Sequence, residues 1–219
     1  MKVFKTVLVL LSILFFNLSV PICSYPAAPD DASIYYPLQA GNVWIYQLDD
    51  NKSTVRYEVV GYLDDRNAYL VKRLTKMIDV EITTEEFIGN SDGRIVYIGG
   101  TDIRSGISRL IFDNEEVILK TTLKSGMTWE YYKDNCDNDL VCRVKCRVVK
   151  FTDCEVKAGR FENVCVVQRM TCYYKGKTEQ YRKVQNEYYA PRVGEIKEES
   201  VDALGNANVF MELLEYKIR

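Results

Sequence analysis

Cysteines in the second half of the chain are the side chains whose type and spacing suggest chemistry most directly. There are six of them: Cys136, Cys142, Cys146, Cys154, Cys165 and Cys172. A zinc site is not expected, because none of these cysteines forms a CxxC pair and the chain has no histidine. In an exported protein an even number of cysteines favours disulfide bonds, with free buried thiols as the alternative.

The spacing of these cysteines predicts how they pair. Cys142 and Cys146 are four residues apart on an expected strand, about 13 Å, which is too far for a disulfide between them. If the segments on either side of Gly159 form an antiparallel hairpin, the remaining cysteines face one another across it, provided that one β-bulge absorbs a one-residue difference. Out of 15 possible connectivities we expect this one: Cys146–Cys172, Cys154–Cys165 and Cys136–Cys142.

The absence of histidine removes most routes to catalysis, including the Ser-His-Asp triad and the Cys-His pair. Adjacent carboxylates such as Glu85/Glu86 and Glu198/Glu199 point to opposite faces of a strand, so they cannot act together as neighbours. No GxSxG, SxxK, P-loop or Rossmann glycine motif occurs. We therefore expect no catalytic residue, no cofactor and no metal site, with a hydrolase built from distant carboxylates as the exception.

The oxygen-rich loop at residues 134–139 suggests one alternative, a calcium site. Counted from Asp134, the EF-hand pattern requires glycine at the sixth position and glutamate at the twelfth. Asp139 and Lys145 stand there instead. A solvated turn is therefore the expected structure of this loop.

The elements that must position these residues are β-strands. Residues 55–59, 80–83 and 143–148 alternate apolar with polar side chains, a period of two that is typical of half-buried strands. Turn signals rich in Gly, Asn and Asp recur every 8–15 residues. We expect ten to twelve short antiparallel strands that form an all-β domain over residues 41–219, a twisted sheet curled into a half-barrel or barrel and stapled by disulfides.

The N-terminal segment indicates export. Residues 1–24 have a basic start, an apolar stretch from Val7 to Phe16 and a more polar exit, which is typical of a signal peptide, and the proline-rich residues 25–40 suggest a linker. Cys23 stands where a bacterial lipoprotein carries its lipid, but the bulky Ile22 before it favours ordinary cleavage. We expect a periplasmic, secreted or envelope-associated protein with no transmembrane helix in the mature chain.

The balance of charge argues against nucleic acid as a partner. The 29 basic and 31 acidic residues give a net charge of −2, whereas a protein that coats nucleic acid needs a cationic excess. Four basic residues nevertheless form a stripe: Arg143, Lys145, Arg147 and Lys150. Either the stripe complements acidic strand faces elsewhere in the domain, or it faces an anionic partner such as lipid headgroups or glycans.

Three stretches resemble a family of secreted proteins and lipoproteins of bacteria that has no settled activity. Residues 35–46 (YYPLQAGNVWIY) resemble its YYPL..G..W.Y opening, and residues 158–165 and 188–197 resemble its aGtF.nc and yYaPgVGlvK segments. Arg192 stands where the third segment usually has glycine, so a positive φ is not expected there. Some proteins of this kind are similar to LolA/LppX half-barrels, which hold lipid in a concave face, and the resemblance implies that fold.

Two functions are compatible with this sequence. The first is a non-catalytic binding or carrier module of the bacterial envelope, with a lipid or other apolar ligand in the concave face. The second is a structural domain of the cell surface that binds another envelope protein through exposed strand faces or edges. A bound ligand would favour the first, whereas a filled interior with an exposed apolar patch would favour the second.

Overall fold

The computed structural model describes residues 32–102, 115–120, 122–133 and 140–219. Several predictions fall outside these residues: the signal peptide, the possible lipid anchor at Cys23, the loop at 134–139 and Cys136. In the described part of the chain no helix is long and apolar enough to cross a bilayer.

The described residues form one short helix and twelve strands. Their bounds are α1 (Ala32–Tyr35), β1 (Val43–Leu48), β2 (Thr54–Leu63), β3 (Ala68–Lys76), β4 (Glu81–Ser91), β5 (Arg94–Asp102), β6 (Glu116–Lys120), β7 (Thr128–Lys133), β8 (Val141–Val156), β9 (Gly159–Lys175), β10 (Thr178–Ala190), β11 (Gly194–Val201) and β12 (Ala207–Lys217). The expected all-β architecture is confirmed. The alternation of buried and more accessible residues along β1, β7 and the first half of β8 is the period of two seen in the sequence.

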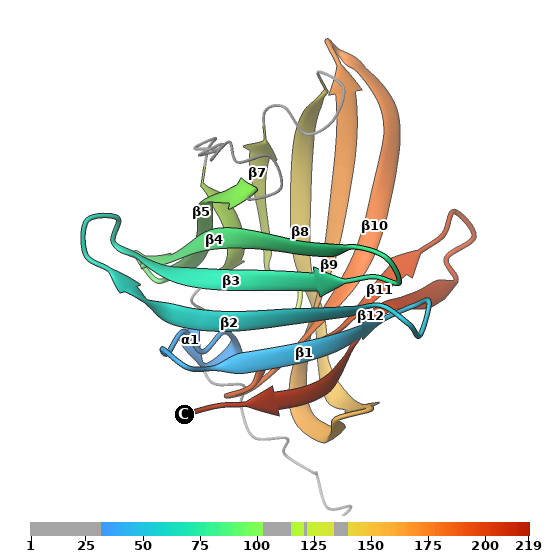
Figure 1. The fold of residues 1–219 in the computed structure, drawn as a ribbon. Helices are drawn as coiled ribbons and strands as arrows, with labels where there is room; N and C mark the ends of the chain where they lie inside the picture. Colours follow the sequence, from blue (N-terminus) through green and yellow to red (C-terminus); the bar gives the residue numbers. More distant parts are fainter. Residues whose placement is uncertain (1–31, 103–114, 121, 134–139) are drawn as a thin grey trace, which may run out of the picture.

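All twelve strands belong to one antiparallel sheet. Strands that follow one another in the chain are paired, except β6 and β7, which form the two ends of the strand order. The order is β6-β5-β4-β3-β2-β1-β12-β11-β10-β9-β8-β7, so β1 pairs with β12 and closes the first half of the chain onto the second. The sheet curls strongly, and β1–β4 cross in front of β8–β10 (Figure 1). The result is a nearly closed barrel, as the sequence predicted.

The two sheet edges, β6 and β7, are linked by side chains instead of a strand ladder. The Trp129 indole N–H on β7 donates to the Val117 carbonyl on β6 over 3.0 Å. Lys133 forms an ion pair with Glu116 across the same seam, with 2.5 Å between Nζ and Oε1. These contacts cover unpaired edges that would otherwise be open to pairing with another chain.

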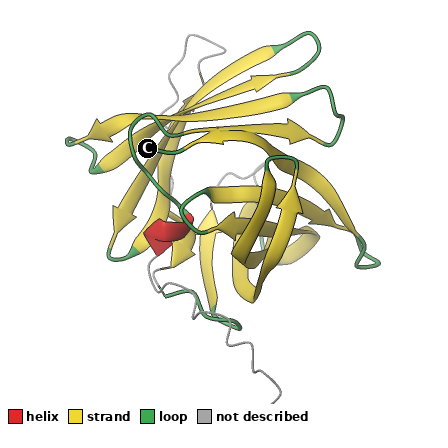
Figure 2. Ribbon diagram, turned by 90° about the horizontal axis from the view of Figure 1, so that it is seen from below, coloured by secondary structure: helices red, strands yellow, loops and turns green. Residues whose placement is uncertain are grey.

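The N-terminal segment packs against the barrel from residue 32 onwards. Tyr35, which lies in the expected linker, is fully buried, and its hydroxyl donates to the Asn163 carbonyl over 3.2 Å. The Arg192 backbone N–H donates to the Ile34 carbonyl over 2.5 Å, which ties α1 to the turn between β10 and β11. Figure 2 shows the helix beside the curled sheet. Arg192 has φ of 64°, so the expectation that this position avoids positive φ was wrong.

The hairpin of β8 and β9 has a different register from the predicted one, and the cross-strand disulfides do not form. A two-residue turn at Lys157 and Ala158 joins the strands and moves the hairpin centre toward the N-terminus. As a result Cys146 faces Arg169, Cys172 faces Arg143, Cys154 faces Phe161 and Cys165 faces Phe151. The pairs Cys146–Cys172 and Cys154–Cys165 are therefore wrong: all four are free, buried thiols.

Cys142 differs from the other four described cysteines because it is disulfide-bonded. Its expected partner, Cys136, lies outside the described residues. The alternation predicted around Cys142 is confirmed, since Cys142, Val144, Cys146 and Val148 are buried on one face of β8.

Candidate functional site

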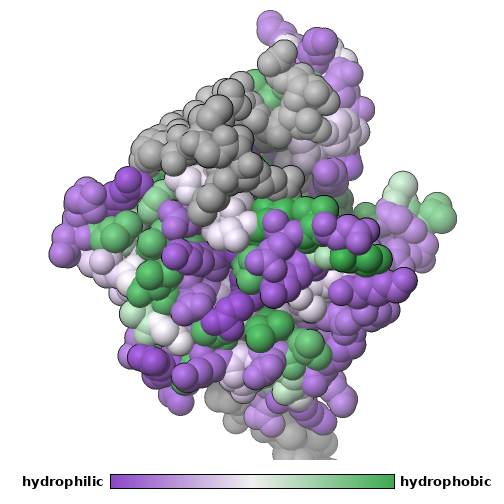
Figure 3. Space-filling view, viewed as in Figure 1, coloured by the Kyte–Doolittle hydropathy of each residue, from purple (hydrophilic) through white to green (hydrophobic). Residues whose placement is uncertain are grey.

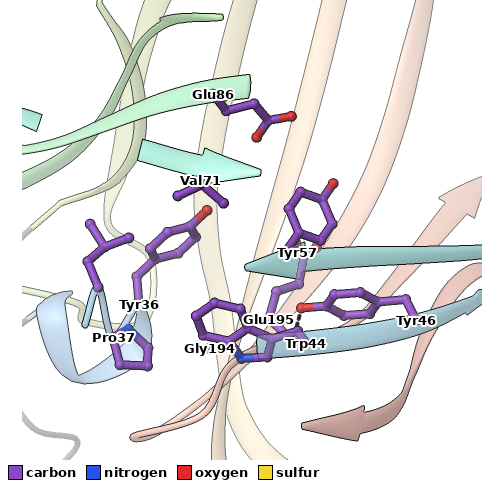
Figure 4. A pocket seen from close by; sticks show the side chains of 10 residues that line it. Tyr36, Pro37, Trp44, Tyr46, Tyr57, Val71, Glu86, Gly194 and Glu195 are labelled. Atoms are coloured by element: carbon purple, nitrogen blue, oxygen red, sulfur yellow. Dashed lines mark hydrogen bonds between the residues drawn. The ribbon is translucent and has the colours of Figure 1, made fainter. Parts of the chain in front are cut away.

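The inner face of the barrel carries a pocket whose lining is mainly aromatic. Antiparallel pairing places Trp44 of β1 opposite Tyr57 of β2, and Tyr57 opposite Arg73 of β3, so these side chains share one face. The pocket has a volume of about 100 Å³. Figure 4 shows its rings together with Glu86. Its lining consists of Tyr36, Pro37, Leu38, Trp44, Tyr46, Tyr57, Val71, Glu86, Gly194 and Glu195.

Hydrogen bonds to the backbone fix two of these rings. The Trp44 indole N–H donates to the Val193 carbonyl over 2.5 Å, and the Tyr46 hydroxyl donates to the Glu195 carbonyl over 2.8 Å. Tyr46 and Tyr57 also contact edge to face, with 5.8 Å between ring centroids. Because the polar tips of Trp44 and Tyr46 are already satisfied, their rings are held in place around the pocket.

Gly194 allows the turn between β10 and β11 to approach the Trp44 ring. Its φ is 103°, a conformation that side chains disfavour. A Cβ atom at this position would lie 3.4 Å from Trp44 Nε1 and 3.5 Å from Pro37 Cδ. Glycine at this position therefore shapes one wall of the pocket.

Charged side chains lie beside the pocket on the inner face. The Arg169 guanidinium of β9 donates from Nε and Nη2 to the two oxygens of Glu187 on β10, the second bond measuring 3.0 Å. Tyr189 donates to Glu187 Oε2 over 2.9 Å, and Arg169 also donates to the Tyr131 hydroxyl. Only 15% of the Arg169 side chain and 10% of the Glu187 side chain are exposed, so this is a buried ion pair.

Three further carboxyl groups on this face have raised pKa values. Burial, followed by repulsion from Glu187 and Glu198, raises the pKa of Glu195 well above its usual range. Burial and Glu187 raise the pKa of Glu198 to about 7. Burial also raises the pKa of Glu86, although Arg73, 3.7 Å away, partly opposes this. The inner face thus keeps carboxyl groups protonated at a pH at which exposed ones are ionised.

None of these inner-face residues was predicted as a site from the sequence. The prediction that Glu85/Glu86 and Glu198/Glu199 point to opposite faces is confirmed, because Glu86 and Glu198 face inward while Glu85 contacts Lys72 and Glu199 contacts Lys197. One member of each pair therefore reaches the interior. No signal in the sequence alone could have joined them, since their meeting depends on strand register.

The predicted basic stripe lies along β8. Arg143 forms an ion pair with Glu130 at 2.8 Å, whereas Lys145, Arg147 and Lys150 are exposed. Lys145 and Arg147 line an open groove of about 530 Å³. That the stripe binds an anionic partner stays a prediction. Among the described residues, no group of three or more cysteine and carboxylate side chains is arranged to hold a metal ion.

On the face shown in Figure 3, hydrophobic side chains are scattered among hydrophilic ones. The apolar side chains with the largest exposed fractions are those of Leu204 and Ile78, at 88% and 71%. They lie in the β11–β12 and β3–β4 turns.

Comparison with known proteins gives a likeness of fold. No family model and no curated protein matches the chain. The crystal structure of a Bacteroides fragilis protein thought to be exported, with a YmcC-like fold, matches with a TM-score of 0.51 and 13% identity over 84% of this chain and 99% of that one. A protein of Parabacteroides distasonis, provisionally described as a lipoprotein, gives a TM-score of 0.47 and 14% identity, covering 84% of this chain and 98% of that one. The fold of this chain is thus similar to the YmcC-like fold.

Proposed function

We propose that the protein is an exported, non-catalytic binding protein that holds a small ligand in the pocket on its inner face. The observation that carries this proposal is the fixed state of the rings. Trp44 and Tyr46 are hydrogen-bonded to the β10–β11 turn, so they lose little freedom when a ligand enters. Preorganisation of this kind lowers the free-energy cost of binding.

Export is supported by two independent observations. Residues 1–24 have the pattern of a signal peptide. The Bacteroides fragilis protein of similar fold is also thought to be exported. We therefore place the binding protein in the envelope or outside the cell.

The volume and the lining of the pocket favour a different ligand from the lipid expected from the sequence. Its volume of about 100 Å³ is below the 300–1,000 Å³ that is usual for drug-sized ligands, so a long acyl chain does not fit it. Glu86 and Glu195 also line the pocket; Glu86 has Arg73 beside it, but an apolar ligand would leave the Glu195 carboxyl group unpaired. The geometry therefore favours a small ligand with a polar part over a lipid chain.

The arrangement of the charged groups supports binding rather than catalysis. Glu187 would be the natural nucleophile or base, but it accepts hydrogen bonds from Arg169 and Tyr189. Its oxygens are thus engaged. A hydrolase built from Glu195 and Glu187 is the exception that the experiment below also detects, because the ligand would then be recovered as a cleaved product.

Native mass spectrometry of the protein purified from its own envelope, before and after organic extraction, tests this proposal. We expect an adduct of one small molecule that disappears on extraction. The Val71→Phe variant, which fills the pocket, should lose the adduct, whereas the matched Val60→Phe variant on the outside of β2 should keep it. A bare polypeptide mass for the wild type would contradict the proposal.

The exposed Ile78 and Leu204 side chains favour a second candidate, a cell-surface domain that binds another envelope protein through these turns. In this case the same measurement should show a protein adduct that survives in Val71→Phe and is lost in the Ile78→Ser/Leu204→Ser double variant.

A further inference from the structure

We propose that the inner-face pocket recognises a small organic cation, a quaternary or protonated amine, through the ring faces of Tyr36, Trp44 and Tyr57 and the carboxyl group of Glu195. This inference rests on the proposed function and names its ligand class.

Four aromatic side chains line the pocket: Tyr36, Trp44, Tyr46 and Tyr57. The face of an aromatic ring is negative and its edge is positive, so a cation is attracted to the face. Trp44 and Tyr46 direct their N–H and O–H groups to backbone carbonyls of Val193 and Glu195, away from a ligand. The pocket therefore offers a ligand mainly aromatic surface, and aromatic rings gathered around one space are the arrangement that proteins use to bind quaternary ammonium groups. The Arg73 guanidinium already lies over the Tyr57 ring, 5.7 Å from its centroid, so a ligand cation would share this ring with Arg73.

One carboxyl group on the inner face, that of Glu195, has no cationic partner in the part of the chain that the structure describes. Two guanidinium groups each have a carboxylate: Arg169 binds Glu187, and Arg73 lies 3.7 Å from Glu86. Glu195 has no such partner, since none of the hydrogen bonds or ion pairs among the described residues involves its carboxyl group. Glu195 is partly buried and lines the pocket, so its carboxyl group faces the space that a ligand would occupy. A cation in the pocket would stabilise the ionised form of Glu195, whereas an anion would disfavour it.

The volume of the pocket fits a ligand of this kind. A space of about 100 Å³ is enough for roughly seven water molecules, or a ligand of similar bulk. Choline and other small ammonium compounds are of this size. The rings and Glu195 could therefore contact such a cation together.

Isothermal titration calorimetry with the full mature protein tests the inference. The probes are choline, ethanolamine and 3,3-dimethylbutan-1-ol, which has the shape of choline without its charge. We expect choline or ethanolamine to bind with one molecule per chain and the neutral isostere to bind at least about tenfold more weakly. Equal binding of choline and its isostere would overturn the inference, because shape and apolar contact would then suffice.

Two variants locate the site. Glu195→Gln removes the charge with little change of shape, and Tyr57→Leu removes one ring; each should weaken choline binding about tenfold or more. Glu155→Gln, at an exposed position of β8, is the matched control and should bind as the wild type does. Because the isostere comparison uses only the wild type, the test holds even if a variant fails to fold. Undiminished binding in Glu195→Gln would assign the cation to another place.

The pH dependence of choline binding gives a separate readout. Because a cation binds the ionised form of Glu195, whose pKa burial raises above its usual range, choline affinity should rise with pH, and proton release should accompany binding. Glu195→Gln should flatten this rise. The charged and titratable groups around Glu195 come from several elements: Tyr36 after α1, Tyr46 of β1, Tyr57 of β2, Arg73 of β3, Glu86 of β4, Arg169 of β9, Glu187 and Tyr189 of β10 and Glu198 of β11.

The source of the ammonium group is distinguished by co-sedimentation with phosphatidylcholine vesicles. Pocket-dependent binding to the vesicles would assign a lipid headgroup, whereas binding of choline without vesicle binding would assign a free small molecule. If no ammonium compound binds but native mass spectrometry still finds an adduct that Val71→Phe removes, the cation inference fails while the proposed function stands. If neither is found, both fail.

Discussion

Replacing Arg169 with methionine should destabilise the protein strongly, because the substitution leaves the Glu187 carboxylate buried without its partner. In the folded protein Arg169 forms two hydrogen bonds to Glu187 and one to the Tyr131 hydroxyl. Methionine fills most of the same space but donates no hydrogen bond. Glu187 would then lie beside the carboxyl groups of Glu195 and Glu198 without the Arg169 guanidinium that acts on all three.

The expected magnitude follows from the burial of the pair. Removing one partner of a buried ion pair typically costs about 3–5 kcal/mol. Since 15% of the Arg169 side chain and 10% of the Glu187 side chain remain exposed, we expect the lower end, about 3 kcal/mol. For a domain of this size that corresponds to a fall in Tm of roughly 6–12 °C.

Urea unfolding followed by tryptophan fluorescence measures this loss. Arg169→Met, Glu187→Gln and the double variant form a thermodynamic cycle, and the double variant should lose less than the sum of the two single variants, with a coupling of about 1–3 kcal/mol. Arg160→Met is the matched control on the same strand, because its ion pair with Asp153 lies at the surface, with 69% of the arginine side chain exposed. It should unfold at the wild-type urea concentration.

Two outcomes would refute the reasoning. A loss below about 1 kcal/mol in Arg169→Met would mean that Glu187 reaches water or takes up a proton at little cost. Additive losses in the cycle would mean that the two side chains stabilise the fold independently and that the ion pair itself contributes nothing.

Three further predictions concern titration, backbone and thiols. The folded protein raises the pKa of Glu198 from 4.5 to about 7, so between these pH values it binds more protons than the unfolded chain. The free energy of unfolding should therefore fall by up to about 3 kcal/mol as pH rises through this window. Urea unfolding at pH 5 and pH 8 measures this fall, which should be smaller in Glu198→Gln. Gly194→Ala should lower the free energy of unfolding by about 1–3 kcal/mol in the same assay, because Gly194 has a φ of 103°. Gly61→Ala, at a position with open space around it, is the control and should be close to neutral. Equal losses in the two variants would contradict the backbone explanation. Alkylation without reductant, followed by mass spectrometry, should label four thiols only in denaturant: Cys146, Cys154, Cys165 and Cys172. If these cysteines could be labelled only after reduction, the predicted cross-strand disulfides would be present after all.

The sequence predicted the architecture well because its signals are local. Alternation of side chains and frequent turn residues depend on a few neighbouring positions, and they indicated an antiparallel all-β domain and the buried face of Cys142 and Cys146. Each of these features is determined within about one turn or one strand.

The register of the β8–β9 hairpin could not be predicted, and with it the disulfides. The predicted hairpin is centred at Gly159, whereas the observed turn lies at Lys157 and Ala158. This small shift along the chain changes which residues face Cys146 and Cys165. The inner-face site was missed for a related reason. Glu86 and Glu195 line the same pocket only because of the pairings that join β4, β3, β2, β1, β12 and β11, and no local pattern shows that sequence of pairings.

The single pairing of β1 with β12 makes this barrel unusual in the order in which it can be assembled. Every other strand pair joins neighbours in the chain, so each forms by closing a short loop, at small cost in chain entropy. The β1–β12 pair instead joins Val43 to Lys217. During synthesis from the N-terminus, β1 can pair with β2 early, but its other edge has no strand partner until β12 is complete. Of all the strand edges, this one is open for longest to pairing with the wrong chain.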